Sequence, residues 1–226
     1  MKKYLSMSAA AVLAATIATP SMADVSANVA ASSNYVWRGV TQTSNKSAVS
    51  GGIDYSNDSG IYAGTWASNV DVGNELDLYF GYGAETNGIA YDAGYIYYAY
   101  TGNGNANNDF GEINVNASMG MFSAGLAYTV NSGKGNNNAA FDTGDIYYHL
   151  GAGGDLQDDW SWSVLYGYYS FNADSSSNKI SYAHGQASVS KSAGDMGDFT
   201  FSLSGAEQTS ISNNDTKAIV SWAKSF

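Results

Sequence analysis

Several ionisable side chains in this sequence alternate with apolar residues, and this pattern limits the chemistry they can perform. Glu75 and Asp77 alternate with Leu76 and Leu78, for example. Successive side chains of a β-strand point to opposite faces, so such carboxylates are expected on a polar face behind an apolar one. Removing the apolar stripes leaves a set of candidate lining residues: Arg38, Glu75, Asp77, Glu112, Asn114 and Asp145.

If the alternating strands close into a membrane-spanning barrel, their expected directions place all six candidates in the same half of it, the half nearest the cell exterior. Rings of carboxylates in a wall of low dielectric favour cations, and an opposed arginine adds a transverse field. One hypothesis is therefore a mainly acidic constriction with Arg38 as its counter-charge. The alternative is that these side chains pair with one another and simply fill space.

Catalysis needs a nucleophile and a base, and the sequence offers few candidates. The two histidines, His149 and His184, fall on polar faces of expected strands without a Gly-x-Ser-x-Gly elbow. Cysteine is absent, and no His-x-x-x-His or EF-hand spacing occurs. The sequence thus predicts no catalytic residue, cofactor or metal site, and an outer-membrane lipid hydrolase is the remote alternative.

The N-terminus has the three parts of a secretory signal peptide. Lys2 and Lys3 supply positive charge, Ala9–Ala18 is an apolar run, and Ser21-Met22-Ala23 fits a cleavage site. The run is too short to span a membrane, which takes about 20 apolar residues. We therefore expect two segments, a signal peptide over residues 1–23 and an exported domain over residues 24–226.

The other end of the chain is an aromatic residue behind an apolar stripe. Counting back in twos from Phe226 gives Lys224, Trp222, Val220 and Ala218, which is one face of a strand. A terminal strand of this kind is typical of bacterial outer-membrane β-barrels, where it serves as the assembly signal. Phe226 is the candidate for that signal.

The composition of the expected exported domain favours such a barrel. Residues 24–226 contain no proline, no cysteine and no apolar run of 18 residues, which excludes a helical membrane protein. They carry 7 Lys plus Arg against 20 Asp plus Glu, a net charge of −13, so nucleic acid is not an expected partner. Eighteen tyrosines and 26 glycines in the whole chain suit a wall between lipid and a polar lumen.

Alternating segments separated by Gly/Asn/Asp/Ser clusters predict an antiparallel up-and-down β-barrel of about twelve strands, with ten or fourteen as alternatives. The expected strands are Val25–Arg38, Ser47–Tyr55, Ile61–Asn69, Glu75–Ala84, Ile89–Tyr100, Glu112–Met119, Phe122–Val130, Thr143–Leu150, Trp160–Tyr168, Lys179–Ser190, Phe199–Leu203 and Lys217–Phe226. The two faces of Ile61–Asn69 and of the tyrosine-rich Ile89–Tyr100 cannot be told apart by pattern.

The connections indicate which end of the barrel faces outward. The two longest Asn/Gly stretches follow the fifth and seventh strands, and tight turns follow the second, fourth and sixth. Short periplasmic turns with longer external loops are the usual asymmetry. Aromatic side chains are then expected at the two lipid interfaces. The outer set is Tyr35, Trp37, Tyr98, Tyr100 and Tyr168, and the inner set is Tyr55, Tyr82, Trp160, Phe199, Trp222 and Phe226.

Residues 25–100 resemble a known group. The stretches that carry the resemblance are Ser26-Ala27-Asn28-Val29, Tyr35-Val36-Trp37-Arg38-Gly39-Val40-Thr41-Gln42, Gly51-Gly52-Ile53-Asp54-Tyr55, Gly60 to Val70, and Glu75-Leu76-Asp77-Leu78-Tyr79. Together they are similar to the opening half of the TorF family of porins. The resemblance implies a Gram-negative outer-membrane barrel with a pore, and it implies no substrate or catalytic residue.

These observations predict an outer-membrane channel for passive diffusion of ions or small solutes, with a preference for cations. The expected partners are outer-membrane lipid and lipopolysaccharide, the barrel assembly machinery and small solutes. A structural or substrate-specific barrel without general pore activity is the alternative. About twelve strands should leave a narrow lumen, so a plugged barrel is also open.

Overall fold

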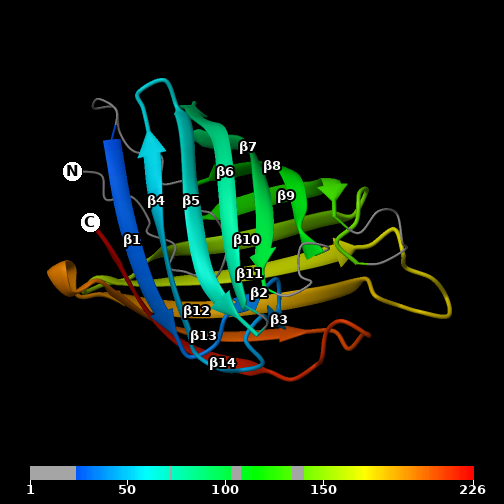
Figure 1. Ribbon diagram of the computed structural model, residues 1–226. Coiled ribbons are helices and arrows are strands. Elements are labelled where there is room, and N and C mark those ends of the chain that lie inside the picture. The colour runs from blue at the N-terminus through cyan, green and yellow to red at the C-terminus, as the bar shows by residue number, and fades with distance from the viewer. Residues whose placement is uncertain (1–23, 72, 103–107, 134–139) are drawn as a thin grey trace.

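The computed structural model describes residues 24–71, 73–102, 108–133 and 140–226 (Figure 1). Twelve antiparallel strands form a closed barrel in the order β1-β14-β13-β12-β11-β10-β9-β8-β7-β6-β5-β4. Their bounds are β1 Asp24–Ser32, β4 Ala48–Ser56, β5 Ile61–Val70, β6 Gly73–Thr86, β7 Ile89–Thr101, β8 Phe110–Met119, β9 Phe122–Ser132, β10 Ile146–Asp155, β11 Trp160–Ser170, β12 Tyr182–Ser192, β13 Asp198–Ala206 and β14 Lys217–Ser225. The predicted fold class and strand number are confirmed. The expected signal peptide lies outside the described residues.

The barrel closes where the last strand meets the first. β14 pairs with β1 from Asn28 opposite Ser225 to Ser32 opposite Ser221. The backbone of Phe226 extends this pairing, because its N–H donates to the Ala27 carbonyl at 2.8 Å and its carbonyl accepts from the Ala27 N–H at 3.2 Å. Closure satisfies the backbone groups that an open sheet edge would leave unpaired.

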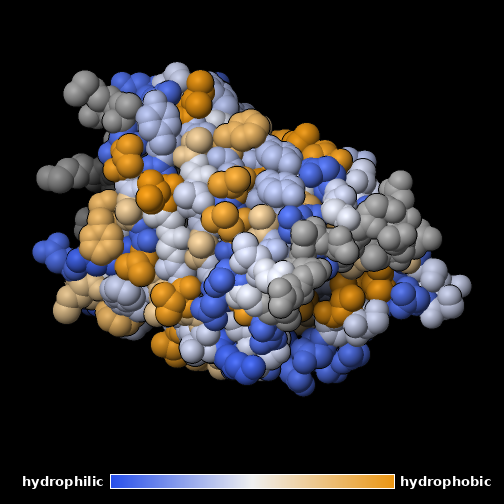
Figure 2. Space-filling view, viewed as in Figure 1, coloured by the Kyte–Doolittle hydropathy of each residue, from blue (hydrophilic) through white to orange (hydrophobic). Residues whose placement is uncertain are grey.

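The outer face of the wall is apolar, as the alternation predicts. Leu78, Phe80 and Tyr82 are 50%, 60% and 52% exposed, whereas Glu75 and Asp77 on the opposite face are 2% and 4% exposed. Figure 2 shows apolar side chains spread over the outward surface. The structure also resolves the undecided strand β5. Its Ile61 faces outward, and its Tyr62 and Trp66 face the inside.

Turns at one end of the barrel are short. Residues 57–60, 87–88, 120–121, 156–159 and 193–197 form them, and the last contains the 3-10 helix η2, Gly194–Met196. The last two are compact because β10 and β12 extend to Asp155 and Ser192, beyond their expected ends at Leu150 and Ser190. Lys224, a charged residue on the otherwise apolar terminal stripe, donates to the Asp195 carbonyl of η2 at 2.7 Å.

At the other end, the 171–181 loop between β11 and β12 is closed by Asp174. Its Oδ1 accepts from the backbone N–H of Ile180 at 2.7 Å and of Ser181 at 3.4 Å. The Ile180 bond is the main reason that the pKa of Asp174 lies below its usual value. A depressed pKa means that the carboxylate stabilises the loop above the unfolded pKa, and that this contribution is lost as the pH falls through the folded pKa.

We therefore expect Asp174→Ala to speed backbone hydrogen exchange in residues 175–181 at pH 6. The difference from the wild type should shrink as the pH falls below about 4, the usual pKa of an aspartate, and vanish once the pH is below the depressed pKa of Asp174. Comparing the two proteins at equal pH cancels the intrinsic pH dependence of exchange. An equal difference at pH 6 and pH 2.5 would contradict the assignment.

The expected first strand, Val25–Arg38, is wrong beyond Ser32. The chain leaves the wall there and forms a separate two-stranded sheet from β2, Val36–Trp37, and β3, Val40–Thr41. We call residues 34–46, which contain this sheet, the lumen hairpin. No helix of the described residues is long and apolar enough to cross a membrane.

Candidate functional site in the barrel lumen

The lumen hairpin turns back on itself at Arg38 and Gly39, which have φ values of +46° and +82°. Two successive positive φ values suit a two-residue hairpin turn, and Arg38 is an unusual residue for this backbone region. Gly39 is required for a second reason, because a Cβ there would lie 2.6 Å from the Cβ of His184. The hairpin starts between β1 and β4, yet its tip reaches β12.

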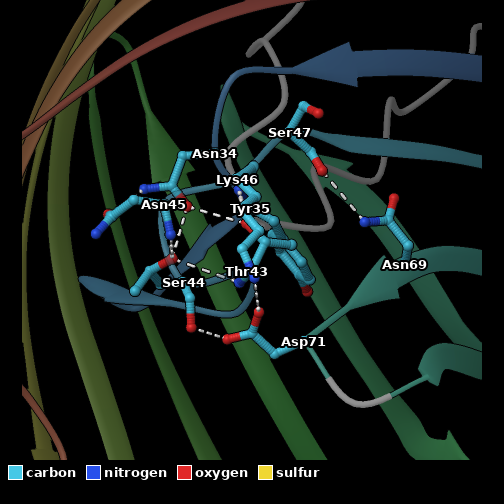
Figure 3. Close-up of polar contacts among 10 residues, drawn as sticks. Asn34, Tyr35, Thr43, Ser44, Asn45, Lys46, Ser47, Asn69 and Asp71 are labelled. Carbon is cyan, nitrogen blue, oxygen red and sulfur yellow. Dashed lines mark hydrogen bonds and ion pairs between the residues drawn. The ribbon is translucent and has the colours of Figure 1, made fainter.

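The base of the lumen hairpin is held by a network of polar contacts (Figure 3). Asn34 Oδ1 accepts from the hydroxyls of Thr41 at 2.6 Å and Thr43 at 3.2 Å. The Thr43 hydroxyl accepts from the Tyr35 N–H at 3.2 Å. The Asp71 N–H, at the end of β5, donates to the Gln42 carbonyl at 2.9 Å. These bonds fix the hairpin to the rim of the wall.

The tip is held by a buried ion pair. The Arg38 guanidinium donates two parallel hydrogen bonds to the Glu112 carboxylate, at 2.8 and 2.7 Å. The hydroxyls of Tyr169 and Tyr98 donate to the same carboxylate at 3.1 and 3.4 Å. The two ionic side chains are only 10% and 1% exposed. A bidentate pair of this kind is directional, so it fixes the position of the tip as well as its charge.

Aromatic rings surround this ion pair. The Arg38 guanidinium carbon lies 4.0 Å from the Tyr147 ring centroid and 4.3 Å from that of Trp37. Trp37 itself packs against rings of the wall, with centroids 5.7 Å from Tyr98 and 5.9 Å from Tyr169. Rings at these separations attract each other and attract a cation over their faces. The tip therefore sits in a packed aromatic cluster.

The sequence predicted Tyr35 and Trp37 at the outer lipid interface, and this prediction is wrong. They are 9% and 7% exposed and lie inside the barrel. Tyr98 also faces inward and is 7% exposed, and Tyr100 packs against the same cluster. Hydrophobic alternation gives the period of a strand, and it does not distinguish a lipid-facing stripe from a stripe packed on the interior.

Nearer its base, the lumen hairpin makes a second contact with the wall. The Tyr35 hydroxyl donates to Glu75 at 2.6 Å, and its ring packs edge-on against Trp66 at 5.5 Å. Asp77 follows Glu75 on the same face and lies between Trp66 of β5 and Tyr98 of β7 in the strand register. Its Oδ1 is buried without a hydrogen-bond partner.

Together, hairpin and wall fill the outer half of the barrel. Eleven of the twelve barrel strands contribute an inward side chain less than 9% exposed at or near this level. They are Ala48, Ser68, Glu75, Tyr98, Glu112, Thr129, Tyr147, Tyr169, Tyr182, Ser204 and Ile219. Side chains of the wall and of the lumen hairpin are therefore packed together in this part of the barrel.

Four of the six predicted lining residues meet in this layer of packed side chains, which we call the seal. Arg38 and Glu112 bond each other, and Glu75 and Asp77 lie beside them. Asn114, two residues further along β8, is half-buried on the same inward face. Asp145 lies apart at the mouth, where its carboxylate accepts the backbone N–H groups of Asp142 at 2.9 Å and Asn172 at 2.8 Å.

The inner half of the barrel holds two carboxylates that the sequence reading did not select. Asp54 accepts from the Tyr79 hydroxyl and from Asn28 Nδ2 at 3.1 Å. Asp92 accepts from the Tyr62 hydroxyl at 2.7 Å and from Asn116 Nδ2 at 3.1 Å. Both carboxylates are half-exposed. The signal was present, because each Asp alternates with outward apolar residues.

The histidines lie against the seal. His149 and His184 each stack with the Tyr147 ring at a centroid distance of 5.7 Å, and His184 Nε2 is 3.0 Å from the Tyr147 hydroxyl. A ring nitrogen, Nδ1, is buried without a partner in each. Within the described ranges, no group of three or more His, Cys, Asp or Glu side chains is placed to hold a metal ion.

These features define a closed, twelve-stranded antiparallel barrel with an apolar exterior and an internal hairpin. The chain belongs to the family described as "Bacterial protein of unknown function (Gcw_chp)", whose model matches residues 15–220. The TorF label is not confirmed by this match. No curated protein matches the chain.

Solved structures with the same fold include a KdgM porin. That structure has 9% sequence identity and a TM-score of 0.60, with 89% of this chain and 99% of the porin covered. A second, the KdgM porin in complex with disordered oligogalacturonate, has 8% identity and a TM-score of 0.58, with 91% and 99% covered. At this identity the likeness shows the fold.

Proposed function

We propose that this protein is an outer-membrane channel for passive diffusion of ions or small solutes, and that the structure captures its closed state. Export would follow cleavage of residues 1–23, and the TorF resemblance would then describe the same group of porins. An apolar exterior and a polar lumen are the arrangement that a barrel needs in a bilayer. Short turns would face the periplasm.

The observation that carries this proposal is the contrast between the two halves of the lumen. In the inner half, the inward side chains of Asn28, Asp54, Asp92, Asn116 and Gln186 are polar and half-exposed. In the outer half, one discrete element, the lumen hairpin, completes the seal. A barrel with no transport role has no need of a wetted lumen beneath a separable plug.

The charge of the lining favours cations or neutral solutes. The KdgM porin has been solved with oligogalacturonate, which is a polyanion. Here the inward carboxylates of Asp54, Glu75, Asp77, Asp92 and Glu112 oppose an Arg38 that Glu112 already neutralises. Like charges in a narrow lumen repel. We therefore propose Arg38, Glu75, Asp77, Glu112, Asn114 and Asp145 as lining residues of a channel that excludes polyanions.

Purified protein in planar bilayers tests this function. We expect small, infrequent current steps from the wild type. Variants with a weakened seal should give frequent steps. A folded barrel is recognised by faster gel migration before boiling than after it. Folded protein that gives no current in any sealed or unsealed form would support the structural-barrel alternative instead.

Phe226 offers a separate test of assembly. We propose that its ring, which is 69% exposed, is read by the barrel assembly machinery, while its backbone pairs with Ala27. Phe226→Ser should lower the amount of heat-modifiable barrel in the outer membrane several-fold. Phe122→Ser is a matched control, because Phe122 is 63% exposed at the same end of the barrel. Equal losses in both variants would show a general lipid-contact effect and overturn the assignment.

A further inference from the structure

The inner half of the lumen contains the same arrangement of three side chains twice. In each, a carboxylate accepts one hydrogen bond from a tyrosine hydroxyl and one from an asparagine amide, on different oxygens. One unit is Asp54 with Tyr79 and Asn28, and the other is Asp92 with Tyr62 and Asn116. Both oxygens of each carboxylate are therefore held in place by neutral donors.

Glycines give each tyrosine its path along the wall. Tyr79 of β6 reaches Asp54 of β4 by crossing β5 at Gly64, where a Cβ would lie 2.5 Å from the tyrosine ring. Tyr62 of β5 reaches Asp92 of β7 by crossing β6 at Gly81, where a Cβ would lie 2.3 Å from the tyrosine hydroxyl. The missing side chains let the rings lie against the wall.

The two carboxylates keep their negative charge uncompensated. Within the described part of the chain, neither Asp54 nor Asp92 takes part in an ion pair, in contrast to Glu112 with Arg38. Both are half-exposed, whereas Glu75, Asp77 and Glu112 are sealed beneath the lumen hairpin. Glu85 of β6 and Asp198 of β13 share the inward face nearer the ends of their strands, so Asp54 and Asp92 are the carboxylates set further into the wetted half.

The opposite wall carries mainly neutral side chains, apart from Asp198 at the inner end of β13. Inward side chains of β12 and β13 form pairs of hydroxyls, with Ser188 Oγ 2.8 Å from Ser202 Oγ and Ser190 Oγ 2.9 Å from Thr200 Oγ1. A fixed acidic stripe facing neutral hydroxyls concentrates small cations along one side of a lumen.

We propose that Asp54 and Asp92, positioned by Tyr79 and Tyr62, are the residues that set a preference for small cations in this channel. This inference rests on the proposed function and names its selective residues. It moves the selective charge from the sealed outer half, where the sequence pattern suggested it, to the open inner half.

The test uses a channel whose lumen hairpin has been shortened, so that current is measurable. The reversal potential is recorded across a KCl gradient with and without Asp54→Asn plus Asp92→Asn. We expect the permeability ratio of K⁺ to Cl⁻ to fall about threefold or more. Tyr62→Phe plus Tyr79→Phe keeps both charges and should lower the ratio less. Asp58→Asn plus Asp158→Asn, on two short turns at the same end of the barrel, is the matched control and should leave it unchanged.

The fall in the permeability ratio caused by Asp54→Asn plus Asp92→Asn should be smaller at 1 M than at 0.1 M KCl, because the screening length falls from about 10 to about 3 Å. Current with an unchanged ratio in the Asn variant would overturn this inference and leave the channel function standing. If the double variant does not fold, the single variants Asp54→Asn and Asp92→Asn test the inference instead. Each should lower the permeability ratio of K⁺ to Cl⁻ by less than the double variant would. Absence of current in every folded variant would overturn the channel function and this inference with it.

Discussion

Replacing residues 36–41 by a short Gly-Ser link should turn a mostly closed barrel into an open channel. The replacement removes Trp37 from the aromatic cluster and Arg38 from Glu112, so the outer half of the lumen loses its filling. We expect the mean conductance of single barrels in planar bilayers to rise at least tenfold. The wall should remain intact, because these residues form no part of the twelve-stranded ladder.

A matched control is a Gly-Ser replacement of residues 174–179, six exposed residues of the 171–181 loop that exclude Phe171 and Ile180 of the buried cluster. It should leave conductance unchanged, and both proteins should keep their heat-modifiable migration. Equal conductance of the wild type and the hairpin variant, with both folded, would show that the lumen hairpin does not close the channel.

Glu112→Ala should release the hairpin tip, because it removes the acceptor of the buried ion pair. It leaves the buried Arg38 guanidinium without its bidentate partner, and breaking a buried ion pair costs about 3–5 kcal/mol. Each 1.4 kcal/mol changes an equilibrium about tenfold, so the open-to-closed ratio should rise by two orders of magnitude or more. The open probability in single-channel recordings measures this ratio.

The paired substitution separates charge from packing. Arg38→Met combined with Glu112→Leu removes both charges and keeps much of their volume, and such replacements are often neutral in stability. We expect this double variant to stay nearly as closed as the wild type, with a coupling energy of a few kcal/mol between the two positions. Additive effects of the two single substitutions would show that the ion pair does not hold the seal.

The wall of this protein was predictable because a barrel strand repeats every two residues. Leu76, Leu78 and Phe80 marked an outward face, and the same count carried through twelve strands. The face of β5 was not predictable, because Ile61 and Tyr62 are both acceptable against lipid. Only the packing of Tyr62 onto the Gly81 position of the next strand decides it.

The seal was predictable in its charges but not in its geometry. Glu75, Asp77 and Glu112 were selected by alternation, yet their partner Arg38 was placed on a strand that ends six residues earlier. Tyr35 and Trp37 continue the period of β1, so nothing in the spacing signals that the chain has left the wall. The one local sign is Arg38-Gly39, a pair suited to a tight reverse turn by its glycine.

The contact between Arg38 and Glu112 joins residues 74 positions apart, and Tyr169 completes it from β11. The lumen hairpin is therefore synthesised early, and the wall residues that bind its tip are synthesised later. An N-terminal fragment that stops before β8 carries an arginine with no acid to receive it. The set of contacts that holds the hairpin tip is thus complete only once β11 has been made.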